Sequence, residues 1–331
     1  MEKADKKFEL IREAVNSDGN LLKVTELCKL AKVSKSGYYR WSGAEDSRNA
    51  REARDRADFD VILSAFRFRG YEKGVRGIYM KLLHNDPPVI MNQKKIRRLM
   101  RKYGLVCNIR SANPYRRMAK ALKTSNVADN LLNREFREHG PRKVLLTDIT
   151  YIPLDGEFCY LSVILDAYTK QVLSYTVSRS LEVDFVLETV NQLIETHGIS
   201  LDCETLIHSD QGCHYTSYRF IQIVSDNNLR QSMSRKGNCW DNAPQESFFG
   251  HMKDEIGGRF KECGGFDEIK EVIDDWMDYY NNERYQWDLA KLSPNEYYEY
   301  LTSGVYPLPI RPPGVTGADA GAAAGGSAPP E

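Results

Sequence analysis

Three acidic residues stand in three separate predicted elements of this sequence. Asp148 lies inside a run typical of a β-strand, Asp210 directly follows another such run, and Glu246 lies in the first turns of a predicted helix. An ionised carboxylate inside a strand is costly to bury unless it is paired or bound to a cation. Because hard divalent cations such as Mg²⁺ and Mn²⁺ prefer oxygen ligands, the three carboxylates suggest a two-metal-ion phosphoryl-transfer site.

Such a site needs no nucleophilic side chain, because two ions about 3.5 to 4 Å apart activate the attacking oxygen and stabilise the leaving one. The sequence has no Gly-rich phosphate loop, nucleophile elbow or His/Cys metal spacing that would support another reaction. Lys253 follows Glu246 by seven residues, so both side chains emerge on the same helix face. Lys253 would reach a phosphate beside the ions, or it is an ordinary surface lysine.

The elements that must position these residues form an α/β pattern in the second half of the chain. Three neighbouring strands predict an antiparallel meander, and two further strands separated by helices predict a mixed sheet with helices packed on it. The predicted strands are 144–154, 157–168, 171–178, 205–208 and 229–233, and the helices between them are 182–197 and 216–227.

Two helical regions are expected after the sheet. Asn242 would cap the helix that carries Glu246, with Gln245 closing a capping box, and this helix would end near Ile256. The last helical region covers 266–302, with a break before Ser293.

Asp166 is the acid that most resembles Asp148 in its surroundings. If Asp155 and Gly156 form a two-residue hairpin turn, Asp148 faces Val163 across the first two strands. Asp166 then points to the opposite face of the sheet from Asp148. We therefore assign Asp166 a structural role.

The charge of the chain is divided between its two halves. In the full 331 residues, 46 Lys and Arg balance 46 Asp and Glu, but residues 1–140 hold 31 basic and 17 acidic residues. The front part therefore carries a net charge of +14 and the remainder −14. A basic half of this kind favours contact with a polyanion.

The basic charge is strongest in residues 87–128, which contain eleven basic residues and no acidic one. A helix with Ile96, Leu99, Met100 and Tyr103 as its apolar stripe is predicted there, ending at Gly104. The one-signed charge around that stripe predicts phosphate contacts. The proposed DNA-contacting residues are Lys94, Lys95, Arg97, Arg98, Arg101 and Lys102.

A helix-turn-helix pattern occupies residues 24–41. Ser34 would cap its second helix, which would present Lys35, Tyr38 and Arg40 to DNA. The alternative is a small helix pair that serves only packing. No run of eighteen apolar residues indicates a membrane span, and seven scattered cysteines are typical of a reducing cytosol.

Three sequence blocks resemble the signature blocks of DDE transposases of the retroviral-integrase superfamily. They are Thr147-Asp-Ile-Thr-Tyr, His208-Ser-Asp-Gln-Gly-Cys-His-Tyr and the stretch from Asp241 to Lys253. Their order and spacing are similar to bacterial insertion-sequence transposases that are second-reading-frame, OrfB-type products. The likeness extends from about Val24 to Tyr300 and includes the helix-turn-helix pattern and the basic helix.

This resemblance implies an RNase H-like catalytic core with Asp148, Asp210 and Glu246 as ligands of two Mg²⁺ (or Mn²⁺) ions. It implies cleavage at the ends of a mobile element and joining of the freed 3′-hydroxyl to another phosphodiester. The implied partners are the terminal inverted repeats, target DNA, further copies of the chain on paired ends, and an upstream-frame product, fused or separate. A cytoplasmic, nucleoid-associated bacterial protein is expected.

The expected organisation is a basic all-helical region before the catalytic core. Two other functions remain open: a metal-dependent nuclease without strand joining, and a catalytically inert DNA-binding repressor. The expected segments are 1–60 (helix-turn-helix-like), 61–125 (basic, DNA-binding), 126–141 (linker), 142–260 (catalytic core), 261–303 (helical extension) and 304–331 (flexible tail).

Overall fold

A computed structural model describes residues 4–107, 132, 139–154, 156–234 and 242–310. The chain forms two compact units, one of residues 1–65 and 94–106 and the other of residues 66–93 and 107–331. In the part of the chain that is described, no helix is long and apolar enough to cross a membrane.

The first unit is helical. Its small core is formed by Phe8, Ile11, Cys28, Tyr38 and Trp41. The Ser34 hydroxyl accepts a hydrogen bond of 3.0 Å from the Gly37 amide, so the predicted cap is confirmed. The helices are α1 (Ala4–Asn16), α2 (Val24–Leu30), α3 (Lys35–Gly43), α4 (Glu45–Arg67, whose last two residues belong to the second unit) and α6 (Gln93–Lys102, from Lys94 onward).

The apolar stripe predicted for α6 is confirmed, and it faces α4. Ile96, Leu99 and Met100 are buried, and the Tyr103 and Phe59 rings lie 4.5 Å apart. The basic residues of α6 therefore surround a stripe that is already covered by α4.

The second unit contains a mixed sheet whose five described strands lie in the order β3-β2-β1-β4-β5. The first three are antiparallel, whereas β4 and β5 run parallel to β1. Asp148 is paired with Val163, so the predicted hairpin register is confirmed. The strands are β1 (Val144–Leu154), β2 (Glu157–Asp166), β3 (Val172–Ser178), β4 (Leu206–Ser209) and β5 (Arg230–Met233).

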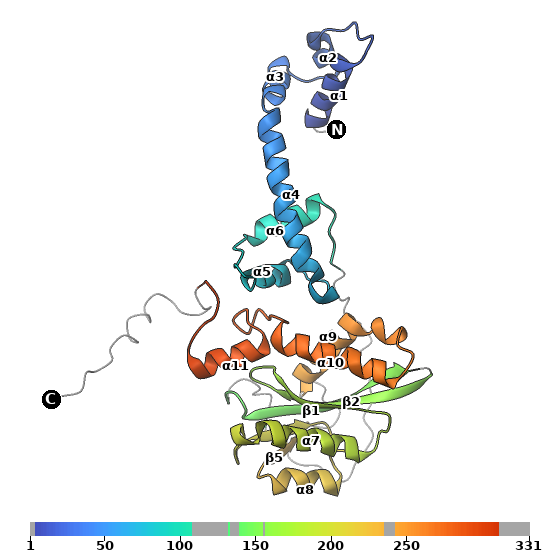
Figure 1. Ribbon diagram of the computed structural model, residues 1–331, viewed down its shortest axis with the longest axis vertical. Helices are drawn as coiled ribbons and strands as arrows, with labels where there is room; N and C mark the ends of the chain where they lie inside the picture. Colours follow the sequence, from blue (N-terminus) through green and yellow to red (C-terminus); the bar gives the residue numbers. More distant parts are fainter. Residues whose placement is uncertain (1–3, 108–131, 133–138, 155, 235–241, 311–331) are drawn as a thin grey trace, which may run out of the picture. The chain divides into compact units, whose positions relative to one another are not determined.

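Helices cover both faces of this sheet (Figure 1). Helices α7 (Val183–His197) and α8 (Tyr218–Asp226) pack on one face, and α9 (Ala243–Ile256) and α10 (Phe266–Asn282) pack on the other. Because β-strand side chains alternate between faces, each strand of the meander contributes to two separate cores.

The remaining elements of the second unit are short. Leu308 is buried against Leu83 and Leu292, so the predicted flexible tail does not begin at residue 304. Most of that tail, and most of the predicted linker over 126–141, lie outside the described residues. The short elements are α5 (Val75–Leu83), α11 (Pro294–Ser303) and the 3₁₀ turns Phe68–Gly70, Gly198–Ser200 and Arg259–Lys261.

Candidate active site

Asp148 lies in the middle of β1 and faces the α9 side of the sheet. Strand alternation puts it on the same face as Leu146 and Ile152, which belong to the core beneath α9 and α10. Its side chain is half-buried, and its Oδ1 accepts a 2.8 Å hydrogen bond from the Ile149 amide. The carboxylate therefore lies on a sheet face where Leu146 and Ile152 offer it no hydrogen-bond donor from their side chains.

Asp210 directly follows β4 and lies level with Asp148. Leu146 on β1 is paired with His208 on β4, and each acid follows its paired residue by two positions along the chain. Neighbouring strands are about 4.8 Å apart, so parallel pairing brings the two backbones side by side. The Gly212 amide donates a 2.8 Å hydrogen bond to Asp210 Oδ1. A Cβ at position 212 would lie 2.9 Å from that oxygen, so a larger residue there would displace the Asp210 carboxylate.

Glu246 lies in the first turn of α9, on the sheet face that Asp148 occupies. Burial, then the carboxylate of Asp210 and more weakly that of Glu246, raise the pKa of Asp148 to about 8. The Ile149 hydrogen bond and Lys253, which is exposed further along α9, act in the opposite direction. The three predicted acids and the predicted lysine are therefore electrostatic neighbours.

These carboxylates suit a hard divalent cation by their chemistry, since a cation would relieve the repulsion that raises the pKa of Asp148. The arrangement is nevertheless open. Among the described residues, no three His, Cys, Asp or Glu side chains lie close enough to hold one metal ion. Side-chain rotation or a shift of α9 would be needed to gather the three carboxylates around a cation.

The predicted cap of α9 is wrong. Asn242 precedes the helix, but its side chain makes no capping hydrogen bond, and Gln245 does not close a capping box. Gln245 is fully buried, and neither its Oε1 nor its Nε2 has a hydrogen-bond partner. Proline in the first turn begins the helix without help from either side chain.

Tyr215 is a buried neighbour of the acids that our sequence reasoning did not single out. Its hydroxyl lies 3.5 Å from Thr147 Oγ1. Burial, and then the negative charges of Asp148 and Asp210, raise the pKa of Tyr215 well above its usual value. The only sequence signal is its position at the end of the block that contains Asp210.

Asp166 is buried away from the three acids, as the parity of β2 predicted. It is paired with Leu145, which belongs to the core under α7 and α8. Its carboxylate accepts hydrogen bonds from the amides of Arg142 (3.2 Å) and Tyr168 (3.0 Å) and from the Thr169 hydroxyl (2.8 Å). These donors connect the ends of β1 and β2.

The basic side chains of α6 fall into two groups. Three of them form ion pairs with acids of α4, which the one-signed sequence did not predict: Lys95 with Asp58, Arg98 with Asp55, and Lys102 with Glu52 and Asp55. Arg97 and Arg101 are exposed and have no ion pair with a described residue. A shallow groove of about 480 Å³ is lined only by Lys94, Arg97, Arg98, Arg101 and Lys102.

In α3, the expectation that Tyr38 is presented to DNA is wrong. Tyr38 is 5% exposed, and its ring lies 6.2 Å from Phe8 and 6.3 Å from Trp41. Its neighbour Tyr39 is the exposed tyrosine, with Lys35 Nζ 5.9 Å from its ring centre. Lys35 and Arg40 are exposed, as predicted.

Three segments of the chain match known protein-family models. Residues 138–239 and 246–300 match models described as integrase core domain, and residues 52–113 match an HTH-like domain. The HTH-like match covers α4, α5 and α6 rather than the pattern at 24–41.

Similar proteins include insertion-element products from bacteria. The insertion element IS600 31 kDa protein of Shigella sonnei is 30% identical over 278 residues, which are 82% of this chain and 97% of that protein. The putative transposase InsK for insertion sequence element IS150 of Escherichia coli K12 is 33% identical over 215 residues, 65% of this chain and 74% of that protein.

Similar solved structures come from retroviruses. A simian T-cell lymphotropic virus intasome chain is 15% identical, with a TM-score of 0.41 over 68% of this chain and 73% of that chain. The HTLV-2 integrase catalytic core in complex with magnesium is 14% identical, with a TM-score of 0.37 over 48% of this chain and 97% of that chain.

The mixed five-stranded sheet, its acids and the family matches define an integrase-type, RNase H-like core that follows a helical HTH-like region. The chain belongs to the IS3 family of insertion-element transposases.

Proposed function

We propose that this transposase cleaves at the ends of its insertion element and joins the freed 3′-hydroxyl to another phosphodiester. The observation that carries the proposal is that Asp148 on β1 lies level with Asp210, which directly follows the neighbouring parallel strand β4. Glu246, in the first turn of α9, acts electrostatically on Asp148. The raised pKa of Asp148 supports the proposal, because like charges are held near one another without a compensating cation.

Asp148, Asp210 and Glu246 would hold Mg²⁺ or Mn²⁺, and we propose two ions. When bound, the ions would polarise the reacting phosphodiester and lower the pKa of the attacking hydroxyl. Lys253 lies on the α9 surface near Asp148, where its ammonium group would bind a phosphate oxygen beside the scissile bond.

We also propose that the first unit holds the terminal inverted repeats of the element. Arg97 and Arg101 are the strongest candidates for phosphate contacts, because they are exposed in a groove with wholly basic lining. Lys35 and Arg40 on α3 are the second group of candidates. Self-association on paired ends is part of the proposal, because an element has two ends and each chain supplies one set of three acids.

The test is an assay of cleavage and joining with labelled element ends in Mg²⁺ and in Mn²⁺. We expect Asp148→Asn, Asp210→Asn and Glu246→Gln each to abolish both steps while DNA binding persists. Asp226→Asn, an exposed acid on α8, is the matched control and should retain both steps. Joining that survives in one of the three variants would remove that residue from the site.

Pre-cleaved ends and a target plasmid separate the remaining functions. A transposase yields joined products from these substrates, whereas a nuclease hydrolyses DNA and yields none. Absence of cleavage, of joining and of any stabilisation by divalent ions in the wild-type chain would instead indicate a DNA-binding repressor.

A further inference from the structure

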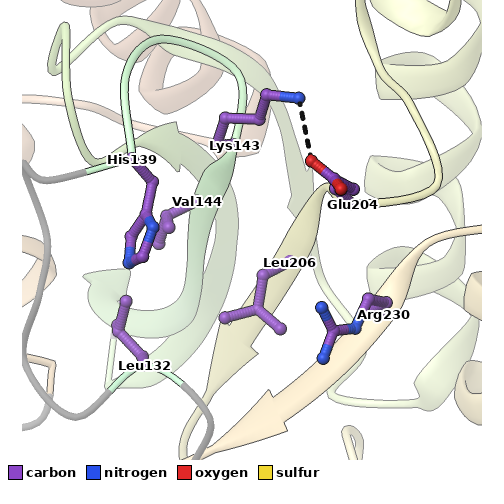
Figure 2. Close-up of a pocket in the computed structure, with 7 residues that line it drawn as sticks. All are labelled: Leu132, His139, Lys143, Val144, Glu204, Leu206 and Arg230. Carbon is purple, nitrogen blue, oxygen red and sulfur yellow. Dashed lines mark ion pairs between the residues drawn. The ribbon is translucent and has the colours of Figure 1, made fainter.

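A cavity lies at the end of the sheet opposite to Asp210, where β1, β4 and β5 begin. Its volume is about 340 Å³. Figure 2 shows the side chains around it. They are Leu132, His139, Lys143, Val144, Glu204, Leu206 and Arg230.

The apolar part of the cavity comes from buried side chains. Val144 is paired with Leu206, and Leu206 is paired with Arg230 across the three parallel strands. Paired residues point to the same face, so the Arg230 side chain emerges beside the Leu206 and Val144 side chains. Leu132 is 1% exposed, and Val144 and Leu206 are buried as well, so these side chains belong to the core beneath the cavity.

The cavity is lined by two basic side chains, Lys143 and Arg230, which differ in whether they form ion pairs. Lys143 is bound to Asp202 at 2.5 Å and lies 3.6 Å from Glu204. Arg230 is exposed, and no ion pair joins it to a carboxylate of the described residues. In Figure 2 its guanidinium lies on the Leu206 side of the cavity, away from the Lys143–Glu204 pair.

We propose that this cavity binds a phosphodiester of a DNA strand, with the exposed Arg230 guanidinium on the phosphate. A guanidinium matches phosphate geometry with two parallel donors, and it is hydrated weakly enough to work beside apolar groups. An acidic peptide would offer carboxylates to the same guanidinium, and its binding is one outcome of the test. The inference rests on the proposed function, since it assigns this site to the same DNA.

The position relative to the acids sets the length of DNA involved. Val144 and Asp148 lie on the same face of β1, four residues or about 13 Å apart at 3.3 Å per residue. At about 3.4 Å of helix axis per nucleotide, this distance corresponds to about four steps of a duplex strand. Arg230 lies two strands across the sheet from Val144, about 10 Å further at about 4.8 Å per strand, so it would bind a phosphate about four to five nucleotides from the reacting bond.

The experiment measures binding of the full chain to duplex element ends over a range of KCl concentrations. Loss of one phosphate contact lowers the slope of log K against log salt by about 0.9. We expect this decrease for Arg230→Gln, whereas Arg230→Lys should keep the slope and bind more weakly. Arg219→Gln on α8, which removes an exposed arginine paired with Asp184, is the control and should leave the slope unchanged.

Neutral methylphosphonates placed at single positions locate the contact. Wild type should lose affinity at one phosphate near the cleaved bond, and Arg230→Gln should be insensitive at that position. A slope of log K against log salt that is the same in Arg230→Gln as in the wild type would overturn the inference. So would an Arg230→Gln chain that loses the ability to bind a polyglutamate peptide but binds DNA as the wild type does. If the wild type joins DNA ends but Arg230→Gln keeps the wild-type salt slope, only this inference is refuted. If Arg230→Gln lowers the salt slope but the wild type never joins ends, only the proposed function is refuted.

Discussion

Arg98 on α6 donates two hydrogen bonds, of 2.8 and 2.7 Å, to the two carboxylate oxygens of Asp55 on α4. These bonds, together with one from Lys102, hold the pKa of Asp55 well below its usual range. Because both donors of a guanidinium fork are engaged, Arg98 has less to offer a phosphate than its exposed neighbours. The pair joins α6 to α4 and leaves the outer arginines to bind DNA.

We expect Arg97→Ala and Arg101→Ala each to lower the salt slope of DNA binding by about 0.9, the value for one lost phosphate contact. Arg98→Ala should change the slope much less and should lower the melting temperature, because Asp55 loses its main partner. Fluorescence anisotropy over a KCl series and a thermal melt distinguish the two effects. Equal slopes in all three variants would show that Arg98 leaves Asp55 when DNA binds.

Asp148→Asn should stabilise the chain when divalent ions are removed with a chelator. The folded-state pKa of about 8 lies above the unfolded value of about 3.9, so the folded chain holds more protons between these limits. The free energy of unfolding of the wild type therefore falls as pH rises from about 4 to about 8, and the Asn variant lacks this loss. Urea unfolding should show a gain in the free energy of unfolding that is larger at pH 8 than at pH 5.

Addition of Mg²⁺ gives the control for that prediction. The ion should stabilise the wild type at pH 8 and have little effect on Asp148→Asn. A gain in stability that is equal at pH 5 and pH 8 would show that Asp148 is not protonated in the metal-free chain.

Glu255 and Arg284 join α9 to the segment after α10, through hydrogen bonds of 2.8 and 3.0 Å, and the Trp276 indole donates to Glu255 at 2.9 Å. Glu255 lies nine residues after Glu246 on the same helix, so this cluster sets how α9 lies over the sheet. Glu255→Gln should cost about 3 kcal/mol of stability, because the Arg284 charge is left without its partner in a mostly buried site. It should also slow joining more than it weakens DNA binding.

Chemical unfolding and the joining assay measure these two effects. Glu271→Gln, an exposed acid on α10, is the matched control. Joining at the wild-type rate in a destabilised Glu255→Gln chain would show that α9 keeps its position without the cluster.

Local patterns predicted the sheet well because the information lies within a few residues. A two-residue hairpin turn fixes which side chains pair, so Asp148 was correctly separated from Asp166. Helix faces were harder to predict. Tyr38 and Tyr39 differ only in which one meets Phe8, and that contact depends on packing between separate helices.

Charges raised a similar difficulty. The acids that neutralise Arg98 and Lys102 lie more than forty residues earlier in the chain, so a count along the sequence cannot find them. The cap of α9 failed for a local reason, since Asn242 has φ −128° and ψ 26° rather than the extended backbone of a capping residue. Asp148 and Asp210 lie level with each other because β1 and β4 are paired in parallel. The family resemblance implied this pairing, whereas the alternation of apolar and polar residues along each strand did not predict it.

Asp166→Asn should have the opposite effects to Asp148→Asn, although both replace an aspartate of the same hairpin. The Asp166 carboxylate is fully buried and accepts hydrogen bonds from two backbone amides and one hydroxyl. The side-chain NH₂ of asparagine cannot accept a hydrogen bond, so at least one of these donors would lose its partner. Each buried group left unpaired costs about 1 to 3 kcal/mol, so the melting temperature should fall clearly. Below that temperature, the folded fraction should still cleave and join DNA, because Asp166 points to the face away from Glu246. Melting curves and joining assays at two temperatures measure both effects. A stable Asp166→Asn chain that cannot join DNA would place Asp166 in the catalytic machinery and contradict the role assigned to it.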